Sequence, residues 1–369
     1  MKKIKSAVSS QGFISFLASL IAIVAGLLFG YILLLMLNAP AATAGMGALL
    51  SDGVSSLNSF AKVLYQAAPL MMCGLSVGFA FKTGLFNIGA PGQYTIGAFF
   101  AILFAVQFQM PWYVCLLASV VGGAIWGLFP GLFKALFNVN EVITSIMFNW
   151  IGMYLVNLIF ANMPMVLASY WGATNSDRTA DLAKANPSAM IPKLGLDELF
   201  GSPYMNISIF IATGVAIIMF VILNKTTFGY ELKACGLNRN ASQYAGINAK
   251  RNIVLSTVIA GALAGLGGGL YYLAGTGQYV LEKVILTRGF DGIPIALLAN
   301  SNPIGTIFSS LFVSYMTVGG SAMQPNFSTE TVNLIIAVII YLAAFSLLVR
   351  NMLSKAFMSR NNKKGDANK

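Results

Sequence analysis

The chain has 369 residues, of which 57% are hydrophobic and only 9% are charged. A soluble protein carries about a quarter charged residues, so this composition excludes a soluble globular fold and predicts an all-α polytopic membrane protein in a lipid bilayer. The net charge of +11 does not indicate nucleic-acid binding, because the basic residues flank apolar runs and form no stripe with interleaved aromatic residues.

The residue types that carry most enzyme chemistry are scarce. Histidine is absent, and Cys73, Cys115 and Cys235 show no metal-ligand spacing. The apolar runs contain no carboxylate pair and no nucleophile with a neighbouring base. We therefore expect no catalytic residues, no metal and no cofactor.

Hydropathy predicts about ten transmembrane segments, one of them short. They cover residues 13–37, 63–81, 94–108, 112–133, 142–161, 205–223, 253–274, 290–299, 304–319 and 332–349. Ten crossings place both termini on one side, and most of the Lys and Arg residues then share that side. Because basic residues mark the cytoplasmic face, we expect both termini there.

This topology divides the chain into a cytoplasmic N-terminus (1–12), a transmembrane domain (13–350) and a basic cytoplasmic tail (351–369). Residues 162–204 form the long outer loop and residues 224–252 the largest cytoplasmic loop. The short segment 290–299 is kept as a crossing, because without it the basic C-terminal cluster would lie outside.

An irregular stretch at 82–97 lies between two strongly apolar segments and contains several glycines, Asn87, Pro91 and Gln93. Irregular backbone is tolerated at membrane depth only where it is buried in protein or lines a wet cavity. We therefore interpret it as part of a solute path. Asn87 and Gln93 offer amides to a solute, and Phe86 either stacks on the solute or packs against a helix.

A weak internal repeat supports this interpretation. Residues 95–103 and 303–311 match at four positions, and each copy follows an irregular segment. Paired interrupted segments in the two halves of a transporter indicate its binding site, so 289–303 is the predicted counterpart of 82–97. Asp291 lies in this counterpart and either caps a helix or faces the path.

The fifth segment and the stretch that opens it carry four further polar residues. Asn138 and Glu141 have the spacing of a capping box. Asn149 and Asn157 place amides in the bilayer, where they either hold helices together or face the solute.

Glycines four residues apart predict helices that pack at close range in the membrane. The clearest sets are Gly123, Gly127 and Gly131 in one segment and Gly261, Gly265 and Gly269 in another.

The cytoplasmic loop 224–252 has the pattern of a compact, rigid element. Asn240 is a predicted cap for a short helix at 241–245, and Gly246 is a predicted stop. This arrangement would present Tyr244 and Ile247 to the cytosol, either as a docking site or as part of an ordinary basic loop.

The long segments contain no Asp, Glu, Lys or Arg as delimited here. Ion-coupled carriers place ionisable groups at depth, and Asp291 alone does not make a proton relay. We therefore expect the energy for active transport to enter from outside the membrane domain.

Three stretches together resemble a known family. Phe86-Asn-Ile-Gly-Ala-Pro-Gly-Gln93, the run from Asn140 to Asn149 and the run from Gly289 to Leu298 are similar to ABC-importer permeases of the branched-chain amino acid and simple-sugar superfamily. The similarity is greatest to the nucleoside branch, which works with a basic-membrane-protein-type receptor. The run from Gly236 to Ile247 resembles that family's ATPase-contacting loop.

The resemblance implies a permease of the bacterial plasma membrane that moves a neutral solute, predicted to be a nucleoside. It also implies a cytoplasmic ATP-binding subunit, a second homologous permease and an extracytoplasmic lipoprotein receptor. Pro91 and Pro294 depart from the family pattern, in which an acidic residue and an alanine are common. A permease for a simple sugar and a secondary carrier or facilitator remain alternatives.

Overall fold

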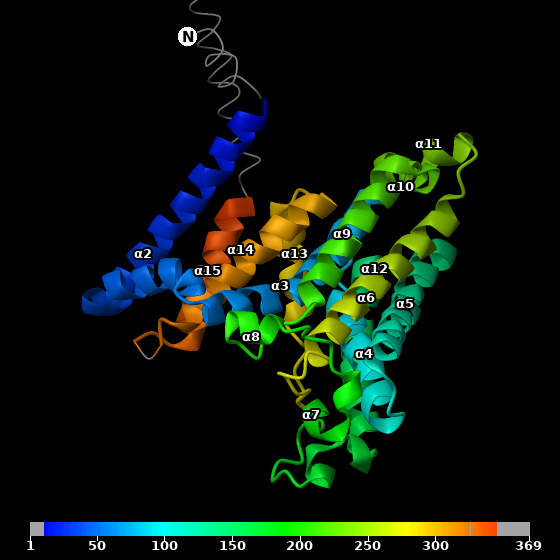
Figure 1. The fold of residues 1–369 in the computed structure, drawn as a ribbon. Helices are drawn as coiled ribbons and strands as arrows, with labels where there is room; N and C mark the ends of the chain where they lie inside the picture. The colour runs from blue at the N-terminus through cyan, green and yellow to red at the C-terminus, as the bar shows by residue number, and fades with distance from the viewer. Residues whose placement is uncertain (1–10, 325, 345–369) are drawn as a thin grey trace, which may run out of the picture. The chain divides into compact units, whose positions relative to one another are not determined.

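The computed structural model describes residues 11–324 and 326–344, and this part of the chain is helical, with isolated β-bridges only (Figure 1). The elements are α2 (Gln11–Ser51), η1 (Asp52–Val54), α3 (Leu57–Lys82), α4 (Ala90–Ile102), η2 (Leu103–Gln107), α5 (Trp112–Phe137), α6 (Glu141–Ala161), η3 (Pro164–Val166), η4 (Ala168–Trp171), α7 (Leu182–Ala185), η5 (Pro187–Ala189), α8 (Leu196–Phe200), α9 (Ser208–Lys225), α10 (Thr227–Leu237), α11 (Arg239–Tyr244), α12 (Ala249–Tyr272), α13 (Arg288–Leu298), α14 (Pro303–Ser321) and α15 (Thr329–Ala344). The all-α membrane fold is therefore confirmed.

Seven helices in the described part are long and apolar enough to cross a membrane. Each of the ten predicted segments coincides with a helix, although α4, α13 and α15 are shorter than a full crossing. The sides on which the termini lie stay predictions, and residues 1–10 and 345–369, including the basic tail at 351–369, lie outside the described residues.

The chain forms two compact units, one of residues up to Gly53 and from Tyr315 onward, the other of Val54–Ser314. In the first unit α2 packs on α15, and a Cβ on Gly26 would lie 2.9 Å from the Cα of Ile339. Asn38 interrupts α2 with φ −155° and ψ 82°, two residues before Pro40, and the helix then resumes beyond the predicted end at residue 37.

In the second unit α12 is the central helix and packs against α3, α4 and α5. The backbones of α12 and α5 lie in direct contact, without side chains between them. A Cβ on Gly265 would lie 2.8 Å from the Cα of Gly123. The same face of α12 meets α4, where Gly97 contacts the backbone of Gly265. The predicted glycine packing is confirmed, and it brings three helix backbones together.

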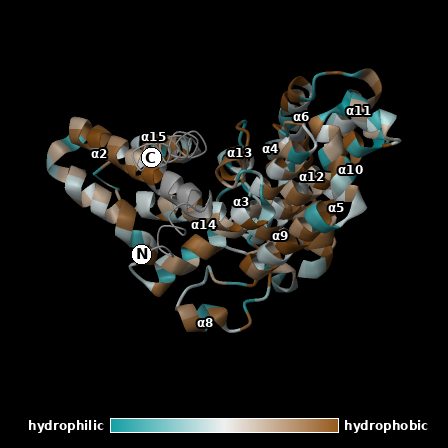
Figure 2. Ribbon diagram, turned by 90° about the horizontal axis from the view of Figure 1, so that it is seen from above, coloured by the Kyte–Doolittle hydropathy of each residue, from teal (hydrophilic) through white to brown (hydrophobic). Residues whose placement is uncertain are grey.

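Hydrophobic and hydrophilic residues separate along this unit. Hydrophobic residues dominate α9 and α12, whereas hydrophilic residues occur on α10 and α11 (Figure 2). The predicted loop 224–252 is thus mostly helical. The long loop 162–204 is also structured, and its Asn186 amide donates to the carbonyls of Ala105 and Met110 at 2.8 and 3.1 Å.

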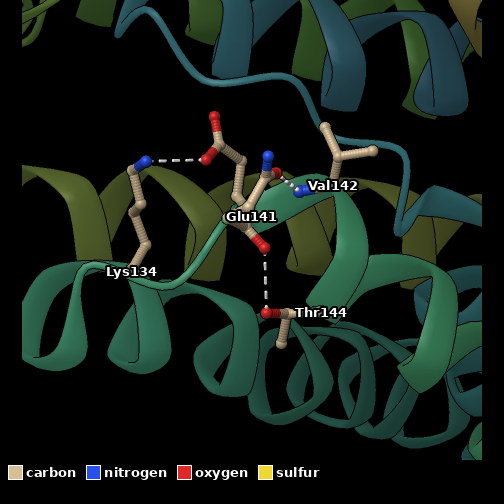
Figure 3. A network of polar contacts seen from close by, with 5 residues as sticks. Lys134, Glu141, Val142 and Thr144 are labelled. Atoms are coloured by element: carbon tan, nitrogen blue, oxygen red, sulfur yellow. Dashed lines mark hydrogen bonds and ion pairs between the residues drawn. The ribbon is translucent and has the colours of Figure 1, made fainter.

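The predicted capping box at the start of α6 is wrong. Asn138 ends α5 in the left-handed conformation, and Asn140 instead caps α6 by accepting from the Val142 amide at 2.9 Å (Figure 3). Glu141 is directed to the Lys134 ammonium, 2.9 Å away. Asn138 and Asn140 are only two residues apart, so both are candidate caps for α6. The geometry of the turn selects Asn140.

The close α12 contact makes a direct prediction for Gly265→Ala. The added methyl would overlap the α5 backbone, which cannot move without shifting a helix, and overpacking of this kind costs about 1–3 kcal/mol. Thermal unfolding in detergent should show a transition lower by several degrees. Gly214→Ala in α9 is the matched control, because nothing lies within 4 Å of its added Cβ. Equal transitions for the two variants would contradict the packing.

Candidate functional site

The chain breaks its helical path directly after α3. Thr83 to Gly89 are non-helical, and Gly84 adopts φ +72°, a conformation that favours glycine. The helix α4 then begins at Ala90 with Pro91 in its first turn, where the missing amide costs no hydrogen bond. The predicted irregular stretch is confirmed as an interruption, and it ends at the start of α4 rather than extending to residue 97.

Two predicted path residues, Asn87 and Gln93, are bonded to each other. Asn87 Nδ2 donates to Gln93 Oε1 at 2.8 Å, and Gln93 Nε2 donates to Asn87 Oδ1 at 3.2 Å. Asn87 also donates to the Ser76 hydroxyl of α3 at 2.9 Å. Both amides are buried, so in this conformation they tie the interruption to the first turn of α4.

Asn149 holds the same interruption from α6. Its Oδ1 accepts from the Gly92 amide at 2.8 Å, and its Nδ2 donates to the Ile88 carbonyl at 3.0 Å. These are backbone groups that the break in the helix leaves without intrahelical partners. Of the two roles left open for Asn149, the structure shows the contact between segments.

Asn157 also bridges segments. Its Nδ2 donates to the Glu282 carbonyl at 2.8 Å, and its Oδ1 accepts from the Tyr279 hydroxyl at 3.0 Å.

Phe86 lies within the interruption and is half-buried. Its ring stacks on Phe81 of α3, with centroids 5.2 Å apart and an interplanar angle of 23°. In this conformation Phe86 packs against a helix.

The short helix α13 meets the first turn of α4. Gly289 contacts the backbone of Pro91, and a Cβ on Gly289 would lie 2.9 Å from the carbonyl carbon of Ala90. A Cβ on Gly292 would lie 2.6 Å from the carbonyl carbon of Cys73, near the middle of α3. The beginnings of two short helices therefore meet inside the unit, and Pro91 forms part of the junction.

Asp291 does not cap α13. The helix begins at Arg288, after Thr287, and Asp291 lies within its first turn, where a carboxylate favours the positive end of the helix dipole. The predicted irregular counterpart at 289–303 is also shorter than expected. Only the turn between α13 and α14 is irregular, where Asn300 and Ser301 have φ near +50°.

Arg288 lies outside the predicted transmembrane segments, in the stretch between 253–274 and 290–299. Its guanidinium lies 3.9 Å from the ring centroid of Tyr271, and the Tyr65 ring lies 5.6 Å from the same tyrosine ring. Counting basic residues by side of the membrane cannot detect such a position. The only signal was its place one turn before Asp291 at the start of a short segment.

The loop 224–252, predicted to be cytoplasmic, forms helices α10 and α11 around a groove. Asn238 caps α11 by accepting from the Ala241 amide at 3.0 Å, so the predicted cap at Asn240 is wrong and Asn240 lies inside the helix. Gly246 ends the helix with φ +81°, as predicted. Tyr244 is 94% exposed and Ile247 is half-buried.

The groove measures about 570 Å³ and lies between α10 and α11. Its lining includes Tyr230, Glu231, Leu237, Ala241, Ala245 and Ile247. The end of α10 rests on the interruption, because a Cβ on Gly236 would lie 2.9 Å from the amide nitrogen of Gly84. The groove and the interrupted helix are thus joined by direct backbone contact.

Interrupted helices inside a helical membrane bundle are typical of membrane transport proteins. The family described as "Branched-chain amino acid transport system / permease component" matches residues 59–344, and the chain belongs to this family. It is a multi-pass protein of the bacterial plasma membrane and, like its family, a non-catalytic transport subunit.

Named relatives cover almost the whole chain. The guanosine ABC transporter permease protein NupP of Bacillus subtilis is 35% identical, with 92% of this chain and 96% of the relative covered. The nucleoside ABC transporter permease protein NupB of Lactococcus lactis is 36% identical, covering 92% and 93%. The glucose ABC transporter permease protein TsgB13 of Haloferax volcanii is 30% identical, covering 92% and 90%.

Bacillus subtilis and Lactococcus lactis each have a second permease that is more distant from this chain. These are NupQ and NupC, and each is 27% identical to the chain. Paired permeases of this kind support a transporter with two permease subunits. No solved structure matches the chain.

The bonding of Asn149 makes a prediction for Asn149→Ala. The change would leave a buried amide and a buried carbonyl without partners, at a cost of about 1–3 kcal/mol for each group. Thermal unfolding in detergent should show clear destabilisation. Asn162→Ala is the control, because this exposed amide bonds only to the Leu158 carbonyl of its own helix. If Asn149→Ala unfolds no earlier than Asn162→Ala, the amide does not hold the interruption.

Proposed function

We propose that the chain is a permease subunit of an ATP-driven importer and forms the transmembrane path for nucleosides. The observation that carries this proposal is the identity of 35–36%, over 92% of the chain, to permeases named for guanosine and nucleoside transport. The solute is neutral and forms hydrogen bonds, which suits a path lined by amides and tyrosines. Because the relative TsgB13 is named for glucose transport, a simple sugar is the second candidate solute.

The path passes the junction between α4 and α13. Phe86, Asn87, Gln93, Asn149 and Asp291 lie on or beside this junction. For a solute to pass, the Asn87–Gln93 pair must open, and the two amides then become available to it. Interrupted helices whose ends face a central site are the common means by which transporters expose polar backbone to a solute.

Energy enters through the groove between α10 and α11. A separate ATP-binding subunit docks there against Tyr244 and Ile247, while Asn240 and Gly246 shape the end of α11. Because Gly236 at the end of α10 contacts Gly84, movement of the docked subunit acts on the interruption directly. A second homologous permease completes the pathway, and an extracytoplasmic lipoprotein receptor delivers the nucleoside.

Reconstitution of the complete transporter tests the proposal. The chain is assembled in liposomes with its ATP-binding subunit, second permease and receptor, and uptake of labelled nucleosides and glucose is measured. We expect nucleoside uptake that requires ATP and is unaffected by collapse of sodium and proton gradients. Uptake that follows an ion gradient without ATP would establish a secondary carrier instead, and uptake of glucose alone would reassign the solute.

The docking site makes a separate prediction for Tyr244→Asp. A charge at the most exposed aromatic of α11 should weaken binding of the ATP-binding subunit and lower uptake at least tenfold, without lowering thermal stability. Tyr170→Asp is the control, because this tyrosine is also exposed, at 61%, but lies in the 162–204 loop. Complex assembly is measured by co-purification. Normal assembly and turnover with Tyr244→Asp would remove α11 from the docking surface.

A further inference from the structure

The hydroxyl of Tyr94 is the strongest unexplained feature of the junction. Tyr94 is fully buried in α4, one turn from Pro91, and its hydroxyl has no hydrogen-bond partner among residues 11–324 and 326–344. Buried hydroxyls are almost always bonded, and an orphan of this kind costs roughly as much as a lost hydrogen bond. The free hydroxyl can therefore donate to or accept from a group that comes from outside the chain.

Arg288 supplies the second half of the same site. It opens α13, whose Gly289 touches Pro91, so the two helix starts bring Arg288 and Tyr94 into one region of the unit. The guanidinium lies 3.9 Å from the centroid of the Tyr271 ring, and none of the ion pairs in the described part of the chain involves it. A guanidinium carries five N–H donors in a planar fork.

A row of tyrosines leads to this site from the end of the long loop. The Tyr65 ring lies 5.6 Å from the Tyr204 ring, just before α9, and 5.6 Å from the Tyr271 ring under Arg288. Lys62 covers the Tyr204 ring at 5.5 Å. These rings therefore form a continuous aromatic row between Tyr204 and Arg288.

We propose that Arg288 and Tyr94 are the base-reading pair of this permease, and that they take nucleosides whose base carries a carbonyl oxygen. This inference rests on the proposed function and names the chemistry within it. A guanidinium pairs in bidentate fashion with the O6 and N7 acceptors of a 6-oxopurine. Adenine presents an amino donor at the same position, which opposes the donors of Arg288.

The residues at the start of α13 suit an uncharged nucleoside. Asp291 lies one turn after Arg288, so the first turn of this helix carries a carboxyl group as well as the guanidinium. A phosphate group on the solute would add negative charge beside that carboxyl group, whereas a nucleoside adds none. Tyr94, with a hydroxyl that both donates and accepts, completes the contact with the base or the ribose.

The test is competition of labelled inosine uptake in the ATP-coupled transporter by unlabelled inosine, guanosine and adenosine. For the natural chain we expect adenosine to compete roughly tenfold less well, the order expected for one bidentate base contact. Arg288→Gln should bring the ratio of adenosine to inosine close to one, because an amide can both donate and accept. Arg178→Gln, in the 162–204 loop, is the control and should keep the natural ratio.

Tyr94→Phe keeps the inference testable if Arg288→Gln does not fold. Loss of an unpartnered hydroxyl should leave thermal stability unchanged or slightly higher, while the KM for inosine rises several-fold. Tyr154→Phe, at an exposed tyrosine of α6, is the control and should change neither quantity.

The outcomes separate the two proposals. Absence of ATP-dependent nucleoside uptake by the natural chain overturns the proposed function. Nucleoside uptake with the same base preference and KM in Arg288→Gln and Tyr94→Phe overturns the base-reading pair alone.

Discussion

The structure depends on satisfying backbone hydrogen bonds where a helix stops inside the bundle. A break at this depth exposes amides and carbonyls that lipid cannot solvate. Asn149 bonds one of each from α6, and the Asn87–Gln93 pair with Ser76 fixes the chain between α3 and α4. On the proposed path, the amides that stabilise the break are also the groups that would bond a polar solute, so stability and transport would use one set of groups.

The helices around the break between α3 and α4 are held together by close glycine packing. The backbones of α4, α5 and α12 approach each other at Gly97, Gly123 and Gly265, which leaves little freedom for these helices to slide separately. By contrast, α13 contacts α4 through one glycine, and the end of α10 reaches the break at Gly84. In the proposed transporter, a movement of α10 would reach the interruption through Gly236 and Gly84, while the close packing of α4, α5 and α12 holds the surrounding helices in place.

The sequence predicted what depends on composition and local pattern. Apolar runs located the seven helices of the described part that are long enough to cross a membrane. Glycine spacing identified the faces of α5 and α12 that pack at close range, and the glycines and Pro91 marked the break after α3. The errors concern choices between near-equivalent neighbours: Asn238 rather than Asn240 caps α11, and Asn140 rather than Asn138 caps α6. The position of Arg288 beside Tyr271 could not be predicted in this way. It depends on how the chain runs between α12 and α13, and no local sequence pattern shows that course.

The central claim is that the solute passes the junction where α4 and α13 begin. Photo-crosslinking of 8-azidoguanosine to the assembled, ATP-coupled transporter, followed by peptide mapping, tests it most directly. We expect adducts on the peptides that carry Phe86 to Tyr94, Tyr271, and Arg288 to Asp291, and we expect an excess of unlabelled nucleoside to prevent them. Protectable adducts confined to other helices, with these peptides unlabelled, would contradict it.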